Sequence, residues 1–214
     1  LILNPRNRQV QREAANPYER HRTIMCAFPE GLPAEERVLH RLEQEPHSGR
    51  LTLLVQSHTR PAWSFLEEKG DYLLPPEPFG PALPNPAVKA FDLSLAPGQI
   101  LRFRLRANPT VKKKRPGRKH GNRVPLVREE RQRSWLQRKG ERNGFRLLEL
   151  GISGEVDRHN QIHRDEETHR LTLHVVQFDG RLQVTDSDKL ADAVAQGLGP
   201  AKAFGCGLLS LAPG

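Results

Sequence analysis

Cysteine is scarce in this chain of 214 residues, and long hydrophobic runs are missing. Cys26 and Cys206 lie far apart and outside any C-x-x-C pair, which fits a reducing compartment without a disulfide framework. No run of about 18 apolar residues could cross a membrane. The chain opens on Leu1, which suggests a trimmed terminus, and shows no charged-then-apolar leader. We therefore expect a cytoplasmic protein with no membrane partner.

Several catalytic signatures are also missing. The sequence has no H-x-E or C-x-x-C ligand pair, no G-x-S-x-G motif and no acidic cluster suited to a two-metal nuclease. His159, His163, His169 and His174 lie close together in sequence, so a metal-dependent hydrolase built on them is one hypothesis. The segment around them has no apolar stripe to hold a helix in place. We therefore expect neither a metal nor a cofactor.

Positive charge is plentiful and unevenly placed. The formal net charge is +9. Residues 100–146 contain 17 Lys or Arg against three acidic residues, a local +14, so the rest of the chain carries −5. This asymmetry predicts a polyanion bound on one face. The alternative is a solvated basic loop that binds nothing specific.

The basic region begins in a regular element. Apolar residues alternate with arginines over 100–107, the period of a half-buried strand with three arginines on one face. A basic loop broken by Pro and Gly follows, and then a helical segment over 129–141. The candidate polyanion-binding residues are Arg102, Arg104, Arg106, Asn108, Lys112, Lys113, Lys114, Arg115, Arg118, Lys119, Arg123, Arg138, Lys139 and Lys202.

The order of the expected elements repeats along the chain. The second half contains strands at 100–107 and 145–150, the helix at 129–141, a hairpin of 170–178 and 181–185 turned at Asp179-Gly180, a helix from Asp186 or Ser187 to Gln196, and a final strand. The first half contains strands at 1–3, 38–43, 50–56 and 88–94, and helices at 16–28 and 62–69. This order predicts an α+β protein of two tandem ferredoxin-like (RRM-like) βαββαβ domains, residues 1–96 and 97–214.

The segment NPYERHR offers one candidate for chemistry. Asn16 is the expected N-cap and Pro17 the first helical residue, so Tyr18 and His21 share one face near a helix N-terminus, where the dipole favours anions. An imidazole can move protons and a phenol can stabilise an oxygen, as phosphoryl transfer requires. Spacing alone favours the simpler interpretation that both side chains pack as half-buried residues.

The stretch GLGPAKAFGCGLLSLAP carries two glycine pairs, Gly197 with Gly199 and Gly205 with Gly207. A nucleotide-binding glycine loop follows a strand and opens a helix, whereas here the expected order is helix, glycines, strand. A nucleotide cofactor is therefore not expected. The glycines instead allow another backbone to approach closely, and Lys202 can supply a point charge to it.

Several of these segments together resemble a known family. The glycine-rich stretch resembles the C-terminal motif of the CRISPR repeat-RNA endoribonucleases, and its FGCGLLSLAP ending is similar to that of the CasE branch, a subunit of the type I-E Cascade complex. RFRLRANP, NRVPL, WLQRK and NPYERHR also resemble CasE segments in the same order. The resemblance spans nearly the whole chain and agrees with two tandem ferredoxin-like domains.

The resemblance implies a metal-independent endoribonuclease of the prokaryotic cytoplasm that cuts precursor CRISPR RNA at the 3′ base of each repeat hairpin. In that family the upstream 2′-hydroxyl attacks the scissile phosphate, giving a 2′,3′-cyclic phosphate and a 5′-hydroxyl. The resemblance makes His21 the general acid or base, with Tyr18 beside it. Some members carry a basic residue where this chain has Cys26. In this chain Arg22, Lys202 or a glycine-loop amide is left to neutralise the charge that develops on the phosphate.

The resemblance also implies retention of the cut RNA and assembly with other Cascade subunits. A rival hypothesis keeps the same fold and RNA hairpin but makes the protein a non-catalytic scaffold, with Tyr18 and His21 purely structural.

Overall fold

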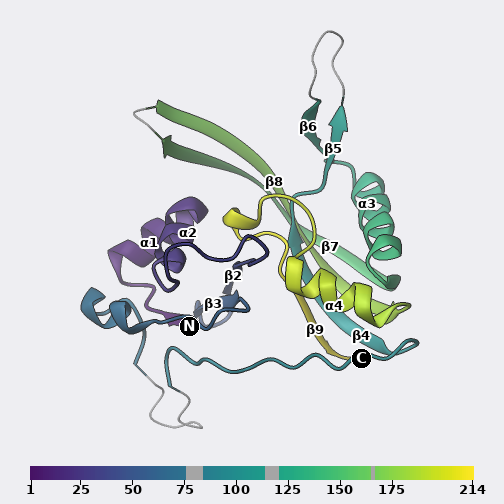
Figure 1. Ribbon diagram of the computed structural model, residues 1–214. Coiled ribbons are helices and arrows are strands. Elements are labelled where there is room, and N and C mark those ends of the chain that lie inside the picture. Colours follow the sequence, from purple (N-terminus) through teal and green to yellow (C-terminus); the bar gives the residue numbers. More distant parts are fainter. Residues whose placement is uncertain (76–83, 114–120, 165–166) are drawn as a thin grey trace. The chain divides into compact units, whose positions relative to one another are not determined.

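The computed structural model describes residues 1–75, 84–113, 121–164 and 167–214, with side chains of 155–171 outside the described set. The chain divides into two compact units (Figure 1). The first comprises Leu1–Asp92 and Ala203–Gly205, and the second comprises Leu93–Lys202 and Cys206–Gly214. The first unit therefore takes one short segment from near the end of the chain.

The first unit is built on an antiparallel sheet of order β1-β3-β2. Its strands are β1 (Ile2–Leu3), β2 (Leu39–Gln44) and β3 (Leu51–Gln56). Its helices are α1 (Arg8–Ala15), α2 (Pro17–Met25) and the 3-10 helix η1 (Ser64–Lys69). The core joins residues from both helices and the sheet, among them Val10, Ile24, Leu53, Trp63 and Leu66. The helix at 8–15 was not among the elements expected from sequence.

The second unit has the sheet order β7-β8-β4-β9, with all neighbours antiparallel. Its elements are β4 (Ile100–Ala107), β5 (Thr110–Lys113), β6 (Asn122–Pro125), α3 (Glu129–Arg142), β7 (Phe145–Arg164), β8 (Glu167–Val184), α4 (Ser187–Gln196), η2 (Lys202–Phe204, whose last two residues belong to the first unit) and β9 (Leu209–Pro213). With β5 and β6 set aside as a separate hairpin, this is the ferredoxin-like βαββαβ order. The α+β class with tandem ferredoxin-like domains is confirmed.

One apolar face of this second sheet is covered by helices. Leu101, Phe103 and Leu105 of β4 share a core with Trp135 of α3 and Leu190 of α4. The arginines between them, at 102 and 104, are exposed. The expected alternation over 100–107 is therefore confirmed.

The expected hairpin at Asp179-Gly180 is wrong, because β8 runs straight through that dipeptide. Gly180 lies opposite Leu150 of β7, beside a β-bulge at Leu147/Glu149. A Cβ on residue 180 would lie 2.1 Å from the Glu149 carbonyl oxygen, so glycine here permits a close strand approach and not a turn. β7 ends at Arg164 and β8 begins at Glu167, and residues 165–166 between them lie outside the described residues.

The expected strand at 88–94 is also wrong, since those residues form no strand and leave Val88 and Phe91 exposed. The edge of β1 where it would pair is already occupied by residues 72–74. Leu3 forms an antiparallel bridge with Leu73, the Leu74 amide donates to the Ile2 carbonyl at 3.0 Å, and the Asn4 amide donates to the Tyr72 carbonyl at 3.0 Å. The Asn85 side chain adds two bonds, accepting from the Ile2 amide at 2.9 Å and donating to the Ile2 carbonyl at 2.8 Å.

Candidate active site

The candidate site starts at the junction of α1 and α2, where one residue serves both helices. Asn16 donates its backbone N–H to the Arg12 carbonyl at 2.8 Å and accepts from the Tyr18 amide with its side chain at 3.1 Å. Pro17 follows at the first position of α2, where a missing N–H has no cost. The expected cap is confirmed, and it fixes Tyr18 and His21 in the first two turns of α2.

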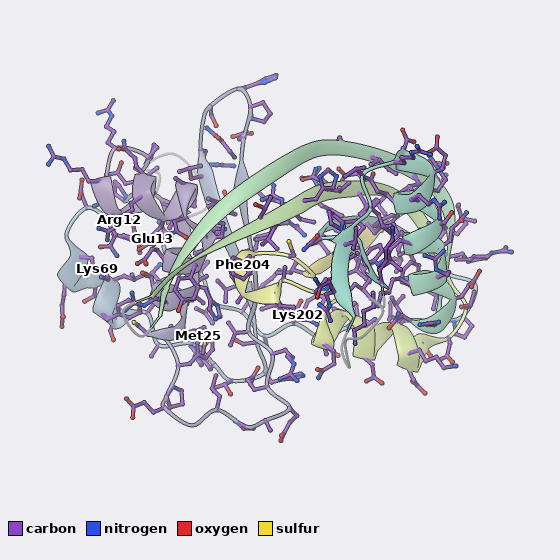
Figure 2. All side chains as sticks on the ribbon, turned by 90° about the horizontal axis from the view of Figure 1, so that it is seen from above. Arg12, Glu13, Met25, Lys69, Lys202 and Phe204 are labelled. Atoms are coloured by element: carbon purple, nitrogen blue, oxygen red, sulfur yellow. The ribbon has the colours of Figure 1, made fainter. Side chains whose placement is uncertain are left out.

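Tyr18 is packed by the segment that the first unit takes from the end of the chain. Its ring stacks on Phe204, with centroids 6.3 Å apart and an interplanar angle of 29°. Figure 2 labels Phe204 beside Lys202 in η2. The half-buried phenol is thereby held with one face against a second aromatic ring.

His21 is packed against a second histidine. Its ring stacks on His40 of β2, with centroids 5.8 Å apart and an interplanar angle of 16°. The His21 Nδ1 is buried and has no hydrogen-bond partner among the described residues. Because Nδ1 is turned into the protein, Nε2 is the ring nitrogen left to meet a ligand.

Burial sets the protonation state of both histidines. Loss of hydration lowers the pKa of His21 below its usual value of 6.5. Burial, the charge of Arg20 and the neighbouring His21 together hold the pKa of His40 well below that value. Both imidazoles are therefore neutral near pH 7, and a neutral imidazole can accept a proton.

A buried polar network supports α2 from behind. The Glu13 carboxylate accepts from Tyr72 at 2.6 Å, from Thr23 at 2.7 Å and from Gln9 at 2.7 Å. Arg20, only 3% exposed, donates Nη1 to the Glu13 carbonyl at 2.8 Å. These bonds tie α1 to α2 and place a guanidinium next to His40.

Gly205 is the one glycine of the quoted stretch that belongs to the first unit. A Cβ there would lie 3.2 Å from Arg20 Nη2 and 3.5 Å from His40 Nε2, and its φ of +79° disfavours other residues. The structure thus brings this glycine to the same site as Tyr18 and His21.

The other three glycines shape a loop inside the second unit. Gly197 ends α4 with φ +73°, and Gly199 lies against the Trp135 ring, where a Cβ would be 3.1 Å away. The Gly207 amide donates to the Arg106 carbonyl at 2.7 Å. Lys202 donates to the Gly199 carbonyl at 3.1 Å, so its ammonium binds this same loop.

The arginine row of β4 is partly engaged within its own unit. Arg104 forms an ion pair with Asp179 at 2.7 Å, and Arg102 donates to the Pro213 carbonyl at 2.9 Å. Arg106 is half-buried at the same face of the strand. Because Arg104 has an acidic partner, the row offers an anion less net charge than the sequence alone indicates.

The hairpin of β5 and β6 carries further cations that the sequence predicted to bind the polyanion. Lys112 pairs with Arg123 across the hairpin and, like Lys113, is exposed. Four predicted residues, Lys114, Arg115, Arg118 and Lys119, lie outside the described residues. On the neighbouring helix Arg138 is exposed, and Lys139 lies 5.8 Å over the Trp135 ring.

Two other predicted residues lie away from solvent. Asn108 is 6% exposed, and its Oδ1 has no partner among the described residues. His174 is 7% exposed and lies 3.3 Å from Gln132 Nε2 of α3. The side chains of His159, His163 and His169 fall outside the described set.

Within the described set, no three His, Cys, Asp or Glu residues are grouped as metal ligands. No helix of that set is long and apolar enough to span a bilayer.

Sequence reasoning missed His40, Arg20 and Phe204. A signal for His40 was present: Val38 and Leu42, two residues to either side, pack against the core, so a histidine occupies a core-facing position of a strand. Phe204 had no such signal, because its contact with Tyr18 depends on the long-range return of the chain to the first unit.

Comparison with known proteins gives one family and several close relatives. The family described as CRISPR associated protein matches residues 1–213. The chain is similar to the CRISPR-associated endoribonuclease Cse3 of Thermus thermophilus, with 40% identity over 100% of this chain and 98% of that one. It is also similar to the Cascade subunit CasE of Escherichia coli, with 42% identity over 58% of this chain and 64% of the relative.

A solved structure agrees with these relatives. Thermus thermophilus Cse3 bound to an RNA representing a pre-cleavage complex is similar with a TM-score of 0.76 and 38% identity, covering 100% of this chain and 97% of that one.

Proposed function

Since the chain belongs to the CRISPR associated protein family, we propose that it processes CRISPR RNA as an endoribonuclease within a Cascade complex. It binds the repeat hairpin of the precursor, cuts once at the 3′ base of the hairpin without a metal ion, and retains the product. It works in the prokaryotic cytoplasm. Full-length similarity to an endoribonuclease supports this assignment.

The observation that carries the mechanism is the state of His21. Its Nδ1 is buried, its ring is stacked on His40, and burial lowers its pKa. A neutral ring held with Nε2 outward is a base ready to accept a proton from an RNA hydroxyl. Tyr18, in the turn before it, donates a hydrogen bond to an oxygen of the reacting phosphate.

The reaction is an internal transfer. His21 takes the proton of the ribose 2′-hydroxyl, the 2′-oxygen forms a bond to the adjacent phosphorus, and the bond from phosphorus to the 5′-oxygen breaks. The proton that His21 took up passes, directly or through water, to the leaving 5′-oxygen, so the products are a 2′,3′-cyclic phosphate and a 5′-hydroxyl and His21 is neutral again. No co-reactant is consumed, and the α2 N-terminus favours the charged phosphate.

The charge that balances the phosphate does not come from Arg22 alone. That side chain is 67% exposed and lies 3.7 Å from Glu19, which offsets its charge. Cys26 ends α2, and its thiol donates to the Arg22 carbonyl at 3.4 Å. Arg20 is a buried cation beside His40 in the first unit.

Hairpin binding falls to the C-terminal domain expected from the sequence, residues 97–214, while the N-terminal domain, residues 1–96, carries the catalytic helix. A-form stems are recognised through shape, phosphates and 2′-hydroxyls. The exposed cations Lys112, Lys113 and Arg123 of the β5–β6 hairpin and Arg138 of α3 meet the phosphates. Arg102, Arg106, Lys139 and Lys202 add to this surface.

The test is cleavage of a hairpin RNA carrying the CRISPR repeat, in EDTA, by the full chain. One site-specific cut is expected, lost in His21→Ala and lost when the upstream nucleotide is 2′-deoxy. The matched control is His47→Ala, which removes an exposed histidine in the β2–β3 turn and should cut normally. Tight binding without any cut by the unaltered protein would favour the scaffold, and loss of the cut in EDTA would favour a metal-dependent hydrolase.

A further inference from the structure

His40 is a polar residue at a core-facing position, where apolar residues are usual. It lies on β2 between Val38 and Leu42, which pack against the core of the first unit, and it is 0% exposed. Neither ring nitrogen has a hydrogen-bond partner among the described residues. A buried imidazole without partners is costly, so its presence calls for a physical reason.

The contacts of His40 supply that reason. One face of its ring stacks on His21 at 5.8 Å with only 16° between the planes. Its Nε2 edge faces Gly205, whose missing side chain leaves room for the ring. The ring is thus held between the glycine and His21.

We propose that His40 is a positioning residue for His21: its flat ring fixes the plane of the His21 imidazole, with Nδ1 inward and Nε2 toward the RNA. This inference rests on the proposed function, in which His21 is the base. His40 itself contacts neither the RNA nor the reacting atoms. It acts by restricting one rotation of its neighbour, and small misplacements of a catalytic group are costly.

The surrounding charges agree with this role. The ionisable groups that face His40 are Arg20 and His21, both on α2. On the other sides stand Val55, its partner on β3, and the segment Ala203–Gly205, which contain no ionisable side chain. Protonating His40 would place a second cation beside Arg20, so the His40 ring stays neutral against His21.

The test compares two substitutions of His40 in the full chain. His40→Leu keeps an apolar side chain but removes the flat ring, and His40→Phe keeps the flat ring but removes the nitrogens. We expect single-turnover cleavage by His40→Leu to fall on the order of 10- to 100-fold, with RNA affinity unchanged, and His40→Phe to keep most of the rate. His47→Phe serves as the control for an exposed histidine.

A second readout does not depend on cleavage. The pKa of the His21 ring, followed by NMR, should rise toward the unperturbed value of about 6.5 in His40→Leu, because the ring turns toward water. It should stay low in His40→Phe. Equal losses in both variants, or an unchanged His21 pKa in folded His40→Leu, would overturn the proposal. Normal cutting by His21→Ala would instead overturn the proposed function, whatever the His40 variants do.

Discussion

The Tyr18 and Phe204 rings stack at 6.3 Å, which joins the start of α2 to the last short helix of the chain. Tyr18 lies one turn before the proposed base. The glycine-rich stretch therefore touches the proposed site at two points. Phe204 packs on Tyr18, and Gly205 packs on His40.

Replacing Phe204 should impair catalysis more than folding. Phe204→Ala removes one face of the Tyr18 stack, so the phenol gains rotational freedom and cleavage should fall roughly tenfold, at nearly unchanged RNA affinity. Single-turnover rates and filter binding measure the two effects. Phe91→Ala is the control, since that ring is 61% exposed. Equal rates for the two variants would contradict a role for the stack.

Alanine at position 205 should lower the free energy of unfolding more than alanine at Gly49, a glycine of similar φ. Gly205→Ala meets Arg20 and His40 at 3.2 and 3.5 Å, whereas Gly49, with φ +69°, has nothing within 4 Å of an added Cβ. Both variants should lose about 1 kcal/mol from backbone strain, and Gly205→Ala more, because its neighbours must move. Chemical denaturation gives both values. Cleavage should fall only in Gly205→Ala.

Cleavage should depend on pH through the lowered pKa of His21. The active form is neutral, so the rate should rise with pH, level off above a midpoint lower than 6.5, and show no loss on approach to neutrality. The profile of single-turnover rates from about pH 5 to pH 8 measures this midpoint. A midpoint at or above the usual histidine value would show that burial does not set the protonation state.

Stability should depend on pH in the same window. His21 and His40 both have folded-state pKa values lowered below 6.5, so the unfolded chain binds protons more readily. Stability from these groups is complete above the unfolded pKa and is lost as pH falls below it. Urea midpoints should drop from neutral to mildly acidic pH, and the drop should be smaller in His40→Phe. An identical drop in the urea midpoint of the unaltered protein and of His40→Phe would show that His40 does not contribute to the pH dependence of stability.

Removing the buried Tyr72 hydroxyl should destabilise the first unit. Tyr72→Phe deletes the 2.6 Å bond to the Glu13 carboxylate and leaves that buried acceptor with fewer donors. We expect a loss of about 1–3 kcal/mol in the free energy of unfolding. Ser48→Ala, which removes a hydroxyl–carboxylate bond at an exposed turn, should cost within about 0.5 kcal/mol. Comparable losses would mean that burial of Glu13 is unimportant.

The secondary structure could be predicted wherever local patterns governed it. The alternation over 100–107, the Asn16 cap and the Asp186 cap of α4 depend on near neighbours in sequence, and all three are confirmed. The dipeptide Asp179-Gly180 gave a wrong prediction of a turn. Its glycine instead lets β8 come close to Glu149 on the neighbouring strand, and a partner so far away in sequence does not show in a local pattern.

The site was only half visible in the sequence. Tyr18 and His21 share a helix, and spacing plus resemblance found them. His40, Arg20 and Phe204 depend on which strand lies under α2 and on a return of the chain from beyond α4. Tertiary contacts of this kind are not encoded in any window of neighbouring residues. The pairing of Leu73 with β1, where the strand expected at 88–94 would lie, is missed for the same reason.

The membership of Ala203–Gly205 in the first unit has a consequence for biosynthesis. A ribosome releases the helix bearing Tyr18 and His21 before residues 93–202, whereas the ring that packs on Tyr18 and the glycine that packs on His40 emerge only after them. The proposed site therefore cannot assemble before residues 93–202 have been translated. A nascent chain that has not reached residue 205 carries the proposed base without its finished surroundings, which ties the onset of cutting to translation past that residue.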